Sequence, residues 1–152
     1  MSYSIRSGRY RRWAPRLAVV VSMMAASGAS VRAARAEELR GQIPFSFTVG
    51  DKTLPPGAYH VEVDVAQGMV ELRDFTHGAF ALAIALDDPR TPETKLVFHR
   101  YGDQYVLREV WTGGGLGREL PEPRVERALA EAAAGKPSAR MERVELPARS
   151  EV

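Results

Sequence analysis

Few residues in this chain have side chains suited to chemistry. His60, Glu62 and Asp64 alternate with other residues, so on a strand they would share one face, about 6.6–6.8 Å apart. With His99 on a suitably paired strand, they could form a mixed histidine and carboxylate site of a small hydrolase or metal-dependent enzyme. A solvated strand face carries the same residues, and the chain lacks the close His-x-His and His-Glu-x-x-His spacings. We therefore predict no catalytic residue, no metal and no cofactor.

A second group of candidate residues belongs to a predicted hairpin. Arg100, Tyr101, Tyr105 and Trp111 flank the turn at Gly102. Aromatic and cationic side chains on one flat surface could bind a glycan, as in a carbohydrate-binding module. The same residues also serve as cross-strand pairs that stabilise a sheet, and the sequence leaves both interpretations open.

The segments that would carry these residues are mostly short strands. Apolar residues alternate over 43–49, 59–65, 70–73 and 79–86, and two further runs, 96–101 and 105–111, form the hairpin. The last residues before Gly135 place Val125, Ala128, Leu129 and Ala132 on one helical face. About six strands and one C-terminal helix predict a mainly β fold, a small antiparallel sandwich or barrel.

Segment 79–86 is apolar on both faces. Phe80, Leu82, Ile84 and Leu86 alternate with four alanines, which indicates a central strand, or one whose outer face is covered by the helix or a partner. A second copy of the chain is one such partner. Beyond residue 135 the apolar periodicity ends, and we expect residues 136–152 to be a mostly disordered tail.

The front of the chain has the pattern of an export signal. Before Glu37 every charged residue is an arginine, and residues 17–29 are an uncharged, mostly apolar run. As a helix this run would rise only about 20 Å, less than the roughly 30 Å of a bilayer core. We predict a signal peptide over residues 1–36 that is cleaved after Ala36. The Arg11–Arg12 pair leaves the general secretory and twin-arginine routes both open.

The composition and net charge argue against nucleic-acid binding and thiol chemistry. Seven of the 21 basic residues precede Glu37. Residues 37–152 therefore contain the other 14 basic residues and all 19 acidic residues, which gives a net charge of about −5. An exported domain of this charge has little general attraction to nucleic acid. The chain has no cysteine, which excludes disulfides and thiol chemistry.

Several short patterns resemble an uncharacterised family of small exported bacterial proteins. They are Ile43–Gly50 (IPFSFTVG), Leu54–Tyr59 (LPPGAY), Lys95–Gly102 (KLVFHRYG) and Gly117–Pro121 (GRELP). The resemblance covers about residues 41–130. It implies export and a compact β domain, and it assigns no activity and no site residues.

We therefore expect a signal peptide (1–36), a β domain with a terminal helix (37–135) and the tail (136–152). The favoured function is a non-catalytic structural or binding module of the cell envelope, periplasmic or secreted. Its partner would be an envelope protein or a glycan, with no nucleic acid and no stable membrane span after processing. The envelope enzyme and the carbohydrate-binding module remain the alternatives.

Overall fold

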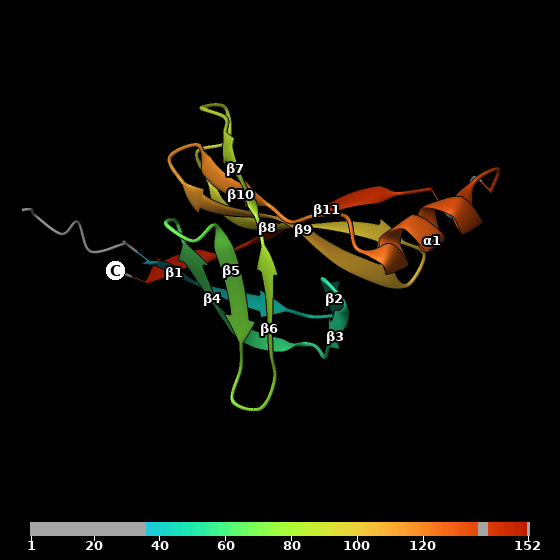
Figure 1. Cartoon of the computed structure of the whole chain (residues 1–152), viewed down its shortest axis with the longest axis horizontal. Coiled ribbons are helices and arrows are strands. Elements are labelled where there is room, and N and C mark those ends of the chain that lie inside the picture. Colours follow the sequence, from blue (N-terminus) through green and yellow to red (C-terminus); the bar gives the residue numbers. More distant parts are fainter. Residues whose placement is uncertain (1–35, 137–139, 152) are drawn as a thin grey trace, which may run out of the picture. The chain divides into compact units, whose positions relative to one another are not determined.

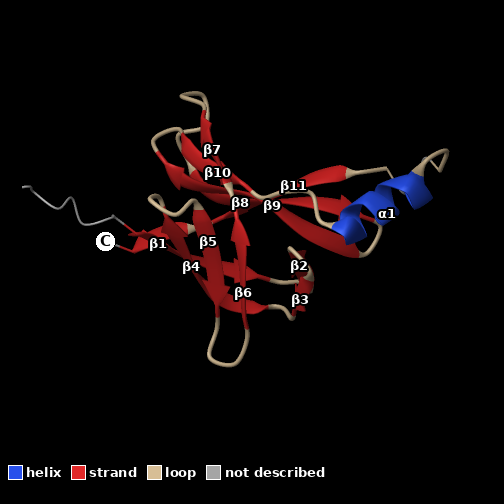
Figure 2. Ribbon diagram, in the orientation of Figure 1, coloured by secondary structure: helices blue, strands red, loops and turns tan. Residues whose placement is uncertain are grey.

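The computed structural model describes residues 36–136 and 140–151, which form twelve strands and one helix (Figures 1 and 2). The predicted signal peptide, up to residue 35, lies outside the described residues. Within the described ranges no helix is long and apolar enough to cross a membrane. The elements are β1 (Ala36–Ile43), β2 (Phe47–Val49), β3 (Lys52–Leu54), β4 (Gly57–Asp64), β5 (Met69–Arg73), β6 (Gly78–Leu82), β7 (Ile84–Asp87), β8 (Thr94–Tyr101), β9 (Gln104–Gly113), β10 (Leu116–Glu119), α1 (Arg124–Ala133), β11 (Glu142–Pro147) and β12 (Arg149–Glu151).

The strands form two sheets whose edge strands follow each other in the chain at two corners. Sheet A has the order β12-β1-β4-β5-β6, and sheet B has the order β11-β8-β9-β10-β7. The β2–β3 hairpin joins sheet B through the parallel pair Thr48–Val106. Only Ala83 separates β6 from β7, and only Ala148 separates β11 from β12, so both corners are made by segments that change sheets. The predicted mainly β fold of sandwich or barrel type is confirmed.

The alternation predicted for the middle of the chain is confirmed. On β4 the side chains of Tyr59, Val61 and Val63 are buried, and on β5 so are those of Val70 and Leu72. The hairpin of β8 and β9 turns at Gly102, whose φ of 61° suits glycine. The core between the sheets contains Leu39, Ile43, Phe47, Val49, Leu54, Tyr59, Val61, Val63, Val70, Leu72, Ala79, Leu96, Phe98, Leu107, Val110 and Leu120.

The first predicted strand, over residues 43–49, is wrong as a single element. β1 ends at Ile43 and β2 begins at Phe47, with Pro44 in the gap. Proline has no N–H to donate to a strand ladder. β1 instead extends back to Ala36 and pairs with β4 along its whole length. This break, a second one at Ala83, and four strands in segments with no predicted strand (β3, β10, β11 and β12) give twelve strands in the described residues where the sequence predicted about six.

Segment 79–86 is also not a central strand. Its first part belongs to β6 and its second to β7, and each lies at an edge of its sheet (Figure 1). Three of the four alanines face inward, with Ala79 buried and Ala81 and Ala83 packed against the core, whereas Ala85 is exposed. On the other face Leu86 is half-buried, whereas Phe80, Leu82 and Ile84 are exposed, since neither α1 nor another strand of the described residues covers them.

The prediction of a disordered tail is wrong for residues 142–151. β11 pairs with β8 from Glu142 to Pro147, and β12 pairs with β1 from Arg149 to Glu151. Val144 and Leu146 pack against the core. Two apolar side chains in six residues are a weak periodic signal, and the segment is ordered here because two open strand edges supply its backbone hydrogen bonds. The helix is therefore followed by strands and does not end the domain.

Candidate functional site

The histidines and carboxylates proposed as a metal site do not come together. His60, Glu62 and Asp64 lie on the outer face of sheet A, as the alternation predicted, whereas His99 lies on β8 of sheet B. Each histidine has its own set of partners. Among the described residues no group of three or more potential ligands could hold a metal ion.

The outer-face residues of β4 have local structural partners. The His60 Nδ1 donates to Glu151 Oε2 at 3.1 Å while its Nε2 accepts from Arg40 at 3.1 Å. Glu62 lies 3.6 Å from Arg73. Asp64 Oδ1 accepts two backbone N–H groups of the following turn, each at 2.9 Å. These contacts are typical of a solvated strand face and a turn.

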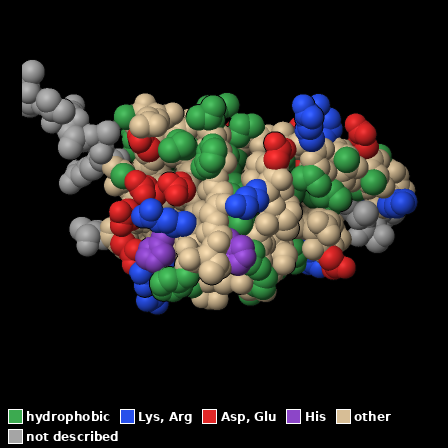
Figure 3. Space-filling model, turned by 60° about the horizontal axis from the view of Figure 1, so that its bottom comes forward, with side chains coloured by type: hydrophobic (Ala, Val, Ile, Leu, Met, Phe, Trp, Pro, Cys, Tyr) green, Lys and Arg blue, Asp and Glu red, His purple; other side chains and the backbone are tan. Residues whose placement is uncertain are grey.

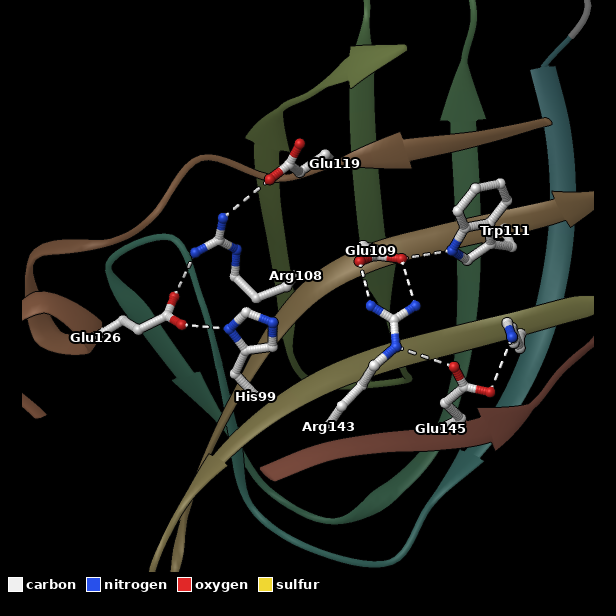
Figure 4. Close-up of polar contacts among 9 residues, drawn as sticks. His99, Arg108, Glu109, Trp111, Glu119, Glu126, Arg143 and Glu145 are labelled. Carbon is white, nitrogen blue, oxygen red and sulfur yellow. Dashed lines mark hydrogen bonds and ion pairs between the residues drawn. The ribbon is translucent and has the colours of Figure 1, made fainter. Parts of the chain in front are cut away.

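His99 belongs to a cluster that attaches α1 to sheet B (Figure 4). The carboxylate of Glu126, on α1, accepts from His99 Nδ1 at 2.6 Å, from Tyr101 Oη at 3.2 Å and from Arg108 Nη1 at 2.7 Å. Arg108 also reaches Glu119 at 3.2 Å. We call these five residues the Glu126 cluster. It joins α1 to β8, β9 and β10.

The apolar helix face identified in the sequence is not the buried face of α1. Val125, Ala128 and Ala132 are exposed and Leu129 is half-buried, whereas the Glu126 side chain is only 2% exposed. The polar partners on β8 and β9 select this face, because they can satisfy a buried carboxylate. No sequence signal distinguishes Glu126 from other helix glutamates.

The electrostatics of the cluster keep Glu126 ionised. Burial alone would raise the pKa of its carboxyl group, but the hydrogen bonds from His99 and Arg108 outweigh burial and lower it. Burial and the nearby Glu126 charge raise the pKa of Tyr101 to about 12. The pKa of Arg108 is raised, because its two carboxylate partners outweigh the effect of burial. A general acid needs a raised carboxyl pKa, so Glu126 is suited to an ion pair instead.

A second cluster lies beside the first on the outer face of sheet B (Figure 4). Arg143 of β11 donates two hydrogen bonds to the Glu109 carboxylate, at 2.7 and 2.9 Å. Trp111 Nε1 donates to the same carboxylate at 2.6 Å. Glu145 bridges Arg143 and Lys95, at 3.0 and 2.8 Å. We call these five residues the Arg143 cluster, and it ties β11 to β8 and β9.

The carboxylates of the Arg143 cluster are also held in their charged form. Burial opposes ionisation of Glu109, but the hydrogen bonds from Arg143 and Trp111 prevail and lower its pKa. Hydrogen bonds from Lys95 and Arg143 lower the pKa of Glu145. Both clusters therefore join secondary structure elements through carboxylates that cationic partners hold in their charged form.

The four hairpin residues do not form a flat binding platform. Trp111 is only 5% exposed and donates to Glu109. Tyr105 stacks on Phe45 with ring centroids 3.7 Å apart, and the Arg100 guanidinium lies 5.5 Å from the centre of the Tyr105 ring. Tyr101 donates to Glu126. Of these residues, Arg100 and Tyr105 are a cross-strand pair of β8 and β9, whereas Tyr101 contacts α1 and Trp111 contacts a residue of its own strand.

Comparisons with models of known protein families, with curated proteins and with solved structures give no match. The fold and the clusters define the class: a mainly antiparallel β protein whose single described helix is attached through a buried carboxylate.

Proposed function

We propose that this protein is an exported, non-catalytic module of the cell envelope that binds another protein through the edge formed by β6 and β7. The observation that carries the proposal is a row of three large apolar side chains. Phe80, Leu82 and Ile84 are 73%, 69% and 67% exposed. We call them the apolar row.

The position of the apolar row supports binding of a protein. Its three side chains follow each other at two-residue intervals, so they project from one face of the extended segment. Contiguous exposed apolar side chains are typical of interaction sites. β6 and β7 are edge strands, which can also accept a strand from a partner. One end of this edge is already covered, because Lys52 Nζ donates to the Gly78 carbonyl at 2.6 Å.

The charged clusters support a non-catalytic role. Glu109, Glu126 and Glu145 all have lowered pKa values and accept hydrogen bonds from cationic partners. A carboxylate engaged in this way is stabilised as an anion and is poorly placed to donate or take up a proton near neutral pH.

Export is proposed from the arginine-rich front and the apolar run that follows it. Cleavage after Ala36 would leave Glu37–Ile43 of β1 in register with β4, so sheet A would keep its pairing. The absence of cysteine is compatible with an oxidising compartment, since this core needs no disulfide.

The proposal can be tested on the protein in its producing cells. We expect the envelope fraction to contain a form whose intact mass begins at Glu37. Uncleaved protein starting at Met1 in that fraction would contradict the export step.

The binding step requires a variant and a matched control. In the first, Phe80, Leu82 and Ile84 are changed to serine; in the second, Val125→Ser and Met141→Ser alter exposed apolar residues elsewhere. After cross-linking in the envelope, we expect the parent and the control to retain the same attached protein and the apolar-row variant to lose it. Equal cross-linking of all three would refute the assignment of the binding surface.

A further inference from the structure

The pairing register of sheet A gathers like charges into two rows on its outer face. One row crosses four neighbouring strands as directly opposed residues, and we call it the acidic row: Glu151, Glu38, Glu62 and Glu71. Two positions along each strand lies the basic row: Arg149, Arg40, His60 and Arg73. The residues between them, such as Leu39, Val61 and Leu72, face the core, so both rows project outward.

This arrangement is only partly neutralised within one chain. Like charges directly opposite each other destabilise a sheet. Some relief comes from contacts between the rows: Glu151 lies 3.0 Å from Arg40 and 3.1 Å from His60, and Glu62 lies 3.6 Å from Arg73. Glu38, Glu71 and Arg149 have no ion-pair partner among the residues that the structure describes.

The two rows together form a charge pattern that is complementary to a second copy of itself. They cross the same four strands, so they have the same length, and they lie about 6.6–6.8 Å apart along the strands. Consider a two-fold axis that lies in the plane of the face, between the rows and parallel to them. Rotation about this axis places the acidic row of one copy opposite the basic row of the other, and the reverse, as a symmetric dimer requires.

The apolar row adjoins one end of this pattern. Glu71, the last member of the acidic row, pairs with Phe80 on β6. The same rotation brings the Phe80 side chains of both copies to the same end of the interface. Phe75, in the turn between β5 and β6, is also fully exposed. Figure 3 views a face on which acidic, basic and histidine side chains lie beside exposed apolar ones. Buried aromatic contacts flanked by paired charges are typical of protein interfaces.

We propose that the outer face of sheet A is the interface of a two-fold symmetric dimer of this chain. The inference rests on the proposed function, because it names a second copy as the protein that binds at and beside the apolar row. Charge pairing between copies supplies the register, and the aromatic side chains at one end supply apolar burial.

Charge exchange tests this geometry directly. The first variant, Glu62→Lys with Glu71→Lys, leaves Glu38 and Glu151 as the only acidic members of the two rows. The second, Arg40→Glu with Arg73→Glu, leaves Arg149 and His60 as the only members of the two rows that are not acidic. Sedimentation velocity of the full chain at low ionic strength should give the mass of two copies for the parent and of one copy for each variant alone. An equal mixture of the two variants should again give the mass of two copies, which also demonstrates that both variants fold.

A salt dependence and a control variant provide two further tests of the dimer. Raising the salt concentration to about 1 M, where the screening length is about 3 Å, should dissociate more of the parent dimer. A control variant that changes two exposed residues, Glu122 just before α1 and Glu131 on α1, to lysine should remain dimeric. A parent that sediments as a single chain, variants that remain dimeric alone, or a mixture that does not associate would each overturn the proposed dimer.

The dimer and the proposed function can fail separately. If the parent is monomeric but an envelope protein is still cross-linked through the apolar row, the dimer is wrong and the proposed binding function stands. If the parent is monomeric and the apolar row cross-links to nothing, both are wrong.

Discussion

Replacing Glu126 with glutamine removes the charge that holds α1 on sheet B and changes the shape of the side chain very little. The carboxylate has three donors, His99, Tyr101 and Arg108. In the variant, the amide can accept from Arg108 through its oxygen, but its NH₂ group would face the other two donors. The perturbation therefore separates the charge of the buried group from its volume.

The size of the effect follows from the burial of Arg108, which is 12% exposed. Removing one partner of a buried ion pair costs about 3–5 kcal/mol. Arg108 keeps a second partner in Glu119 at 3.2 Å, although its Nε has no hydrogen-bond partner among the described residues. We therefore expect a smaller loss of about 2–3 kcal/mol in the stability of docked α1, between the cost of one charged hydrogen bond and that of a broken pair.

Hydrogen exchange of the α1 amides measures this loss where it occurs. A loss of about 2–3 kcal/mol makes exchange about 30- to 150-fold faster. Glu131→Gln, on the exposed side of the same helix, is the matched control and should change stability by less than about 0.5 kcal/mol. If Glu126→Gln exchanged no faster than Glu131→Gln at pH 7, the Glu126 cluster would not be what holds the helix.

Three further predictions concern other parts of the molecule. The pKa of Glu126 is lowered in the folded state, so the stability that its charge contributes is complete above the ordinary glutamate pKa of about 4.3 and is lost as pH falls through the lower folded value. In urea titrations the parent and Glu126→Gln should therefore converge in stability below about pH 4. A constant difference down to about pH 2 would contradict this. Gly117→Ala should lower the stability measured in a thermal melt by about 1–3 kcal/mol, because a Cβ there would lie 2.7 Å from the Trp111 ring. The control Gly57→Ala, where the nearest atom is at 3.5 Å, should lower it less. Equal melting temperatures of the two variants would refute the packing argument. Deleting residues 142–152 should expose the edges of β8 and β1 and produce aggregation detectable by light scattering; a soluble, monodisperse product with the parent's melting temperature would mean that β11 and β12 are dispensable.

Much of the fold could be predicted because its signals are local. The alternation in β4 and β5 and the Gly102 turn depend on residues that are neighbours in the sequence. The order within 142–151 could not be predicted, because it depends on open edges of β8 and β1 that lie far away in the chain. The split of segment 79–86 likewise follows from the point at which it changes sheets.

The candidate sites also have a part that local sequence determines and a part that tertiary contacts determine. The sequence by itself determined that His60, Glu62 and Asp64 share the outer face of one strand, since a period of two is a property of any strand. Only the tertiary structure decided which groups meet. The partners of Glu126 are 18 to 27 positions away in the chain, and the acidic and basic rows exist only because of the register between β12, β1, β4 and β5. Charges interact through space at distances of a few ångströms, and sequence separation carries little information about those distances.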